Sequence, residues 1–284
     1  MKRIFTFSAF IVVILLLNCC TSSRHISVKG DKEIVEKKYQ FEDFNKIESV
    51  IPYLIEYVQS SETPTVVVKT DNNIQEYIEI KVKNNTLHIG LTDNRGNLSI
   101  QPTVFIVYVN STTLIGASVI GSGKLNINSN LSAKKLSFDV TGSGDIIIPH
   151  IEGDKATFSV VGSGSINNAS CKVSEMKMTI SGSGKISSNN INSSAINAQL
   201  AGSGRIFLSG VTQKKALELV GSGSIQAENL TAAISSCSIA GSGIIKANAI
   251  ETLSGNLSGS GKMYYKGNPK VAVEIVGSGK LIPL

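Results

Sequence analysis

The tripeptide Gly-Ser-Gly occurs nine times in this chain of 284 residues, and all nine copies lie beyond residue 120. Consecutive copies begin 18 to 21 residues apart. The first glycines of the nine copies are Gly121, Gly142, Gly162, Gly182, Gly202, Gly221, Gly241, Gly259 and Gly277. A period near 20 residues is typical of repeat proteins, in which each repeat forms one unit that stacks on the next. The sequence therefore predicts a solenoid.

Aliphatic residues recur at constant offsets from each tripeptide. The residue two positions before the first glycine is always Val, Ile or Leu, and the residue four positions after it is always Leu, Ile or Met. Apolar and polar residues alternate on both sides of the tripeptide, which indicates two short strands with one inward face each. A further apolar position, expected at a second corner, is occupied by Leu131, Ile151, Cys171, Ile191, Val211, Leu230 and Ile250.

Both glycines of each tripeptide are predicted to form the corner of a rung. Corners stacked about 4.8 Å apart need positive φ or a close backbone approach, and glycine allows both. The predicted turn residues are Gly121, Gly123, Gly142, Gly144, Gly162, Gly164, Gly182, Gly184, Gly202, Gly204, Gly221, Gly223, Gly241, Gly243, Gly259, Gly261, Gly277 and Gly279. We expect an all-β, single-domain β-helix with rungs of about 20 residues and right-handed winding.

The N-terminal segment has the features of an export signal. Lys2 and Arg3 precede an apolar run from Ile11 to Leu17, and Cys19 and Cys20 follow it. A cysteine directly after such a run resembles the lipobox of bacterial lipoproteins. We expect a signal peptide over 1–19 and lipidation of Cys20, with Cys19 as the alternative. An ordinary secretory signal stays open, and so does a membrane helix, although the run is shorter than the ~20 residues a span needs.

The rest of the chain is predicted to form a tether and one domain. Residues 20–43 are polar and mixed in charge, which indicates a tether, and 44–284 form the β-helix. Within it, 44–110 lack the tripeptide and are expected to form irregular first rungs and a cap, whereas 111–284 hold the repeats. A hairpin is predicted around Asn84-Asn85. A separate small β domain over the first part is the alternative.

The residue pattern indicates neither a catalytic site nor a metal or cofactor site. Asp139 and Asp145 bracket one turn, but two acids make a weak calcium site. His25, His88 and His150 have no partner at metal-ligand spacing. Gly-Ser-Gly-Lys lacks the spacing of a phosphate-binding loop, and no nucleophile elbow occurs.

Charge and cysteine positions narrow the class of protein further. Loss of Lys2 and Arg3 with the signal lowers the net charge from +6 to about +4, and no basic run follows. No nucleic-acid partner is therefore expected.

Cys171 and Cys237 fall in apolar columns about three rungs, or ~14 Å, apart. That separation exceeds the reach of a disulfide, so both are predicted to be buried free thiols.

The nine tripeptides with their aliphatic columns, after a lipobox-like segment, resemble the head GIN domain of "putative auto-transporter adhesins" of Bacteroidota. The resemblance runs from about Asn45 to the C-terminus, including the entry at 44–51 and Asp71-Asn72-Asn73. It implies a β-helix similar in outline to pectin lyases but without their catalytic residues, and a role in adhesion. It implies no specific functional residues.

We therefore expect a non-catalytic cell-envelope lipoprotein, held at the outer membrane by an N-terminal lipid and facing the periplasm or the surface. Its polar columns would be presented to a glycan or an envelope protein. Two other interpretations remain open at this point. One is a structural or stress-related envelope component without an external ligand, and the other is a β-helix enzyme acting on polysaccharide.

Overall fold

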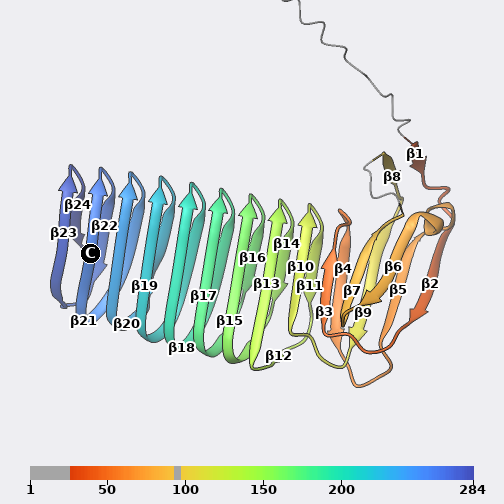
Figure 1. Cartoon of the computed structure of the whole chain (residues 1–284), viewed down its shortest axis with the longest axis horizontal. Coiled ribbons are helices and arrows are strands. Elements are labelled where there is room, and N and C mark those ends of the chain that lie inside the picture. The colour runs from red at the N-terminus through yellow and green to blue at the C-terminus, as the bar shows by residue number, and fades with distance from the viewer. Residues whose placement is uncertain (1–25, 93–96) are drawn as a thin grey trace, which may run out of the picture.

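A computed structural model describes residues 26–92 and 97–284 of the chain. Strands stack rung upon rung into an elongated β-solenoid of about 8 turns, as the sequence predicts (Figure 1). The predicted signal peptide, Cys19, Cys20 and His25 lie outside the described residues. Among the described residues, no helix has the length and apolar character to cross a membrane.

The first part of the domain contains nine strands and one short 3-10 helix. In chain order they are β1 (Ile26–Lys29), β2 (Ile34–Gln40), β3 (Lys46–Ser49), β4 (Leu54–Gln59), β5 (Thr65–Asp71), η1 (Asn72–Tyr77), β6 (Ile78–Lys83), β7 (Thr86–Leu91), β8 (Leu98–Gln101) and β9 (Phe105–Ser111). β6 and β7 form the predicted hairpin, and Asn84 and Asn85 turn it with φ of 51° and 57°. β3 and β4 pair in parallel with the first repeat strands, so this part is continuous with the repeats.

The expected tether over residues 20–43 is corrected for residues 26–40, which belong to the cap. β2 pairs antiparallel with β5, and β1 pairs parallel with β8. The buried carboxylate of Asp71 also holds this region together. It accepts hydrogen bonds from the backbone N–H of Lys32 at 2.8 Å and from the N–H and hydroxyl of Thr103 at 2.6 and 2.8 Å. These contacts are remote in sequence, so local composition does not reveal them.

The repeats follow as one parallel stack. Their strands are β10 (Gly116–Gly121), β11 (Lys124–Ile127), β12 (Leu131–Ser132), β13 (Lys135–Gly142), β14 (Asp145–Ile148), β15 (Ile151–Gly162), β16 (Ser165–Asn168), β17 (Cys171–Gly182), β18 (Lys185–Gly202), β19 (Arg205–Gly221), β20 (Ser224–Gly241), β21 (Ile244–Gly259), β22 (Lys262–Lys266), β23 (Lys270–Gly277) and β24 (Lys280–Pro283). Each rung has a strand before the Gly-Ser-Gly corner, a strand after it, and a third short side beyond a second corner. The inward columns of all three sides meet in one hydrophobic core.

The first and second glycines of each tripeptide are required for different physical reasons. The first glycine of each tripeptide has a positive φ, between 99° and 129°. The second instead approaches the rung below, because a Cβ on Gly164 would lie 2.3 Å from the carbonyl oxygen of Gly144. Ser163 and Gly164 both donate their N–H to the carbonyl of Gly142, at 2.8 and 2.9 Å. Each corner is thus hydrogen-bonded to the corner before it.

The seven apolar residues expected at the second corner do not all point inward. Val211 is 54% exposed and Ile250 is 58% exposed, whereas the other five are buried. The rungs that contain these two residues are short, and their ladders shift register near the second corner. Ile191 consequently pairs with Gly210, and Ala249 fills the inward position next to Ile250. The expectation is wrong for these two rungs because their shorter chain moves the column by one residue.

Both described cysteines are free and buried in the core, as predicted. Burial raises the pKa of Cys171 and of Cys237 to about 12. They therefore act as small apolar side chains and have little thiolate character at neutral pH.

A buried lysine is an exception in this core. Lys215 is 2% exposed and occupies an inward position. Its Nζ donates hydrogen bonds to the carbonyls of Leu230 at 2.6 Å, Asn248 at 2.8 Å and Ala227 at 3.3 Å. The ladder shifts register beside Ala227 and Leu230, so regular pairing is interrupted there. Burial lowers the pKa of Lys215 to about 8, against the opposing effects of Cys237 and Glu228.

Replacement of Gly162 by alanine should destabilise the solenoid by about 1–3 kcal/mol, because an L-residue would have to adopt a φ of +115°. The added Cβ would also lie 2.4 Å from the carbonyl oxygen of Gly142. Urea unfolding followed by circular dichroism measures the effect. Ser163→Ala is the matched control, because this exposed side chain should change stability by less than about 0.5 kcal/mol. Equal stability of the two variants would contradict the role given to the corner.

Lys215→Met should change how stability depends on pH. Between the folded pKa of about 8 and the ordinary value of 10.5, the unfolded chain binds a proton that the folded chain releases. Rising pH therefore favours the folded state through this group, by up to about 3 kcal/mol across the window. The free energy of unfolding of the wild type minus that of Lys215→Met should rise from pH 8 to 10.5. Taking this difference removes the opposite contribution of Cys171, which both proteins share.

The exposed neighbour Lys214 supplies the control for this experiment. Lys214→Met makes the same substitution at an exposed position. A difference curve for Lys215→Met that does not rise would show that Lys215 keeps an ordinary pKa in the folded chain.

Candidate functional site

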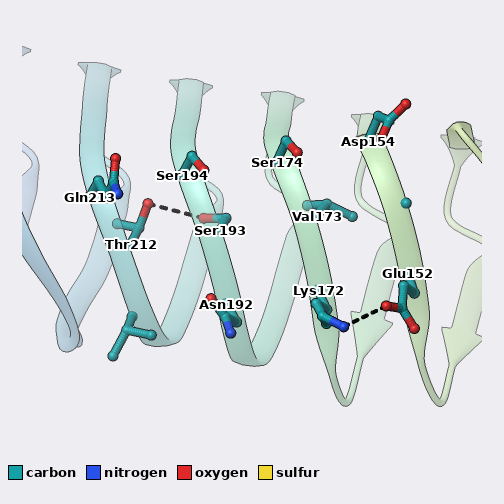
Figure 2. A pocket seen from close by; sticks show the side chains of 12 residues that line it. Glu152, Asp154, Lys172, Val173, Ser174, Asn192, Ser193, Ser194, Thr212 and Gln213 are labelled. Atoms are coloured by element: carbon teal, nitrogen blue, oxygen red, sulfur yellow. Dashed lines mark hydrogen bonds and ion pairs between the residues drawn. The ribbon is translucent and has the colours of Figure 1, made fainter.

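A polar groove runs across four consecutive rungs, where the third side of each rung bends into the strand before the corner (Figure 2). Its volume is about 610 Å³. Strands β15, β17, β18 and β19 contribute three residues each. The lining residues are Glu152, Gly153, Asp154, Lys172, Val173, Ser174, Asn192, Ser193, Ser194, Val211, Thr212 and Gln213.

Parallel pairing in register places equivalent residues of the four rungs side by side. One row consists of Glu152, Lys172, Asn192 and Val211. The next row, which follows Gly153, contains Val173, Ser193 and Thr212, and these three side chains are buried. Neighbouring rungs lie about 4.8 Å apart, so the four rungs extend the groove over about 14 Å.

One ion pair neutralises most of the charge at one end of the groove. Lys172 Nζ lies 2.6 Å from Glu152 Oε1 (Figure 2). The hydrogen bond and positive charge of Lys172 lower the pKa of Glu152, and Glu152 raises the pKa of Lys172 in turn. Both side chains are exposed to solvent, so the pair adds little to stability. The Asp154 carboxylate is left as the uncompensated charge of the groove.

The other polar side chains of the groove are of two kinds. The buried Ser193 hydroxyl donates to Thr212 Oγ1 at 3.0 Å, and Thr212 donates to the carbonyl of Lys214 at 3.2 Å, so these groups are satisfied within the protein. In contrast, the outward side chains have no hydrogen-bond partner among the described residues. These are Asp154, Ser174, Asn192, Ser194 and Gln213. They can donate to and accept from a bound molecule.

The groove holds few titratable side chains. The titratable side chains in the groove are Glu152, Asp154 and Lys172, and two of these three neutralise each other. No residue of the lining is a histidine or a cysteine. Across the part of the chain that the structure describes, no three His, Cys, Asp or Glu side chains gather as metal ligands would.

Asp139, Asp145 and His88 lie apart from the groove, whereas His150 lies near its edge and contributes to the lowered pKa of Glu152. The half-buried Asp139 accepts a hydrogen bond from Ser137 Oγ at 3.2 Å, and burial raises its pKa. Asp145 instead accepts from Ser165 on the next rung. His88 contacts Glu48 at 2.9 Å in the first rungs. The structure therefore does not bring these residues together into a site.

Sequence reasoning did not single out the groove. The expected polar columns lie on the strands beside the tripeptide, where period-2 alternation reveals them. The groove lies on the third side instead, and runs such as Asn192-Ser193-Ser194 read as a polar loop. The signal that marks it is that Glu152, Lys172 and Asn192 occupy equivalent positions once the repeats are aligned by their glycines.

Comparison with known proteins gives a family and a set of similar structures. The family model described as "putative auto-transporter adhesin, head GIN domain" matches residues 43–206 and 186–269. A search of curated proteins finds no match.

Three of the similar structures come from Parabacteroides. A "putative lipid binding protein" from Parabacteroides distasonis is 25% identical with a TM-score of 0.71, and the match covers 91% of this chain and 100% of that one. A "putative adhesin" from the same organism is 27% identical with a TM-score of 0.67 and the same coverage. A "putative adhesin" from Parabacteroides merdae, at 24% identity and a TM-score of 0.68, covers 91% and 99% and supports the fold alone.

Proposed function

Because the chain belongs to the family described as "putative auto-transporter adhesin, head GIN domain", we propose that it is a non-catalytic binding module of the cell envelope that holds a glycan in the polar groove. The observation that carries the proposal is the set of outward amide, hydroxyl and carboxylate groups that have no hydrogen-bond partner within 26–92 and 97–284. They lie on four rungs in register, so they suit a ligand that is extended and rich in hydroxyl groups.

The composition of the groove favours a glycan over other ligands. Amide and hydroxyl side chains both donate and accept hydrogen bonds, as a sugar hydroxyl requires. Val211, which is 54% exposed, adds an apolar surface beside Asn192 for the carbon face of a sugar ring. One structural relative is described as lipid binding, but the polar lining of this groove is poorly suited to an acyl chain.

The membrane anchor is the second part of the proposal. Cys20 follows the apolar run of the signal, and the described fold begins six residues later at Ile26. Six extended residues span at most about 20 Å. A lipid on Cys20 would therefore keep the cap of the solenoid close to the membrane surface.

Asn192→Ala combined with Gln213→Ala should weaken glycan binding by about tenfold, because each substitution removes a hydrogen bond worth about 0.5–1.5 kcal/mol. An array of neutral and acidic oligosaccharides identifies a glycan that the wild-type chain retains, and calorimetry with that glycan measures the change. The matched control is Gln199→Ala with Asn256→Ala, on the strands before the corner. The control should bind as the wild type does.

Three outcomes would count against glycan binding in the groove. If the array retains nothing, a structural envelope component without an external ligand becomes the better interpretation. If the control variant weakens binding as much as the groove variant, the glycan binds elsewhere. If the retained glycan is cleaved on incubation, the chain acts as a polysaccharide-active enzyme.

Cys20→Ser should release the protein from the membrane fraction of a bacterial host that makes lipoproteins, because the thiol that would carry the lipid is lost. Cys19→Ser should leave it in the membrane fraction. Detergent-phase partition and the mass of the N-terminal peptide measure both effects. Retention of Cys20→Ser with loss of Cys19→Ser would assign the lipid to Cys19, and release of neither would indicate an anchor of another kind.

A further inference from the structure

The strand after each Gly-Ser-Gly corner turns one side chain outward directly after the corner. In four of the six later rungs this residue is a lysine or an arginine, and in the other two it is Ser224 or Ile244. The outward face is formed by the beginnings of β18 to β21 together with β22 and β24, the light-blue to dark-blue rungs of Figure 1. Its exposed cations are Lys185, Arg205, Lys262, Lys266 and Lys280. None of these five takes part in an ion pair within the described chain. We call this surface the cationic face.

Like charges lie on neighbouring rungs of this face. Lys185 is in register with Arg205, and Lys262 with Lys280. Like charges directly opposite one another on adjacent strands, about 4.8 Å apart, destabilise a sheet. A negatively charged surface lying against the face would attract each of these cations and so offset the repulsion between them. The arrangement therefore favours an anionic partner.

The charge excess is local and does not merely reflect the net charge of the chain. Among the described residues of the cationic face, the acidic residue is Glu228, and its Oε1 atom lies 3.5 Å from Lys246 Nζ. The same side of the earlier rungs carries Glu56 and Asp145 together with the exposed Lys124. Across the core, the strands before the corner mix both signs, with Asp139, Glu218 and Glu274 among Lys135, Lys155, Lys177, Lys214 and Lys270.

The shape of the face and its other side chains indicate what kind of anion it meets. Arg205, Lys262 and Lys280 are exposed at the beginnings of their strands, and none of the three lines the polar groove. Half-buried Phe207 and Tyr264 lie among the cations, and Lys185 Nζ lies 5.0 Å from the Phe207 ring centre. Cations beside amphipathic aromatic rings are typical of surfaces at the membrane–water interface.

We propose that the cationic face docks the solenoid onto a bilayer surface that carries anionic phospholipid headgroups. The face would lie flat, with Arg205, Lys262 and Lys280 among the phosphates and the side of Tyr264 at the headgroup level. Each lysine or arginine near such a surface changes the partition coefficient by about fivefold. Added salt should weaken the interaction, since the screening length falls from about 10 Å at 0.1 M to 3 Å at 1 M.

A chain that begins at residue 21 is suited to the test, because it removes the apolar signal and keeps every described element. The solved structures that match over their full length cover 91% of this chain. Sedimentation with vesicles of phosphatidylcholine, with and without phosphatidylglycerol, measures partition at low salt. The wild type should bind the anionic vesicles and leave the neutral vesicles unbound.

Lys262→Gln combined with Lys280→Gln should lower partition onto the anionic vesicles by about 25-fold, because two such charges are removed. The matched control is Lys135→Gln with Lys177→Gln, which removes the same charge from the opposite side of the core and should keep binding near the wild-type value. Circular dichroism and urea unfolding show whether each variant is folded. Asn192→Ala with Gln213→Ala should also keep vesicle binding, so a failure here and a failure of glycan binding are separable.

Three results would overturn the proposal. An equal loss in the Lys135/Lys177 control would show that net charge alone drives the interaction. Equal binding to neutral vesicles would remove the role of the headgroup charge. Binding of soluble alginate that depends on Lys262 and Lys280, without binding of vesicles, would make the face a site for an anionic polysaccharide instead.

Discussion

The structure depends on the in-register stacking of one rung on the next, and the last rung shows how much burial this supplies. Leu253 and Leu257, with rungs on both sides, are fully buried. Val271 and Ile275 continue the same two columns with a rung on one side, and they are 40% and 42% exposed. Covering that fraction of an aliphatic side chain contributes about 1 kcal/mol. The hydrophobic core of each rung is therefore completed by its neighbours.

Stacking also explains where the rungs are uniform and where they vary. At the Gly-Ser-Gly corner each rung must pass within hydrogen-bonding distance of the one before it, so the glycines repeat without exception. No particular residue is required at the second corner. The ladders shift register there, as between Ser188 and Ile191, and absorb differences in rung length. Lys215 serves this irregular region, because its amine hydrogen-bonds to carbonyl groups beside a shift in the ladder.

These differences decide what could be predicted from the sequence. The fold, the corner glycines and the two main inward columns follow from a local pattern that repeats nine times. The strand β2 could not be recognised, because it is polar and forms through pairing with β5, about 30 residues away. The exposure of Val211 and the groove beside it depend on the path of the second corner, which is set by contacts between rungs. A single lysine in an apolar column likewise gives no sign of which carbonyls it will reach.

The same geometry produces two outward surfaces of different character. A column places one side chain from each rung about 4.8 Å from the next, so a property shared by successive rungs extends over the surface. In the groove, neutral donors and acceptors such as Asn192 and Gln213 recur, and the proposed glycan site rests on them. On the cationic face, charges such as Lys262 and Lys280 recur, which gives a potential that a flat anionic surface can meet. Because the core constrains only the inward positions, the two surfaces can change independently while the fold is kept.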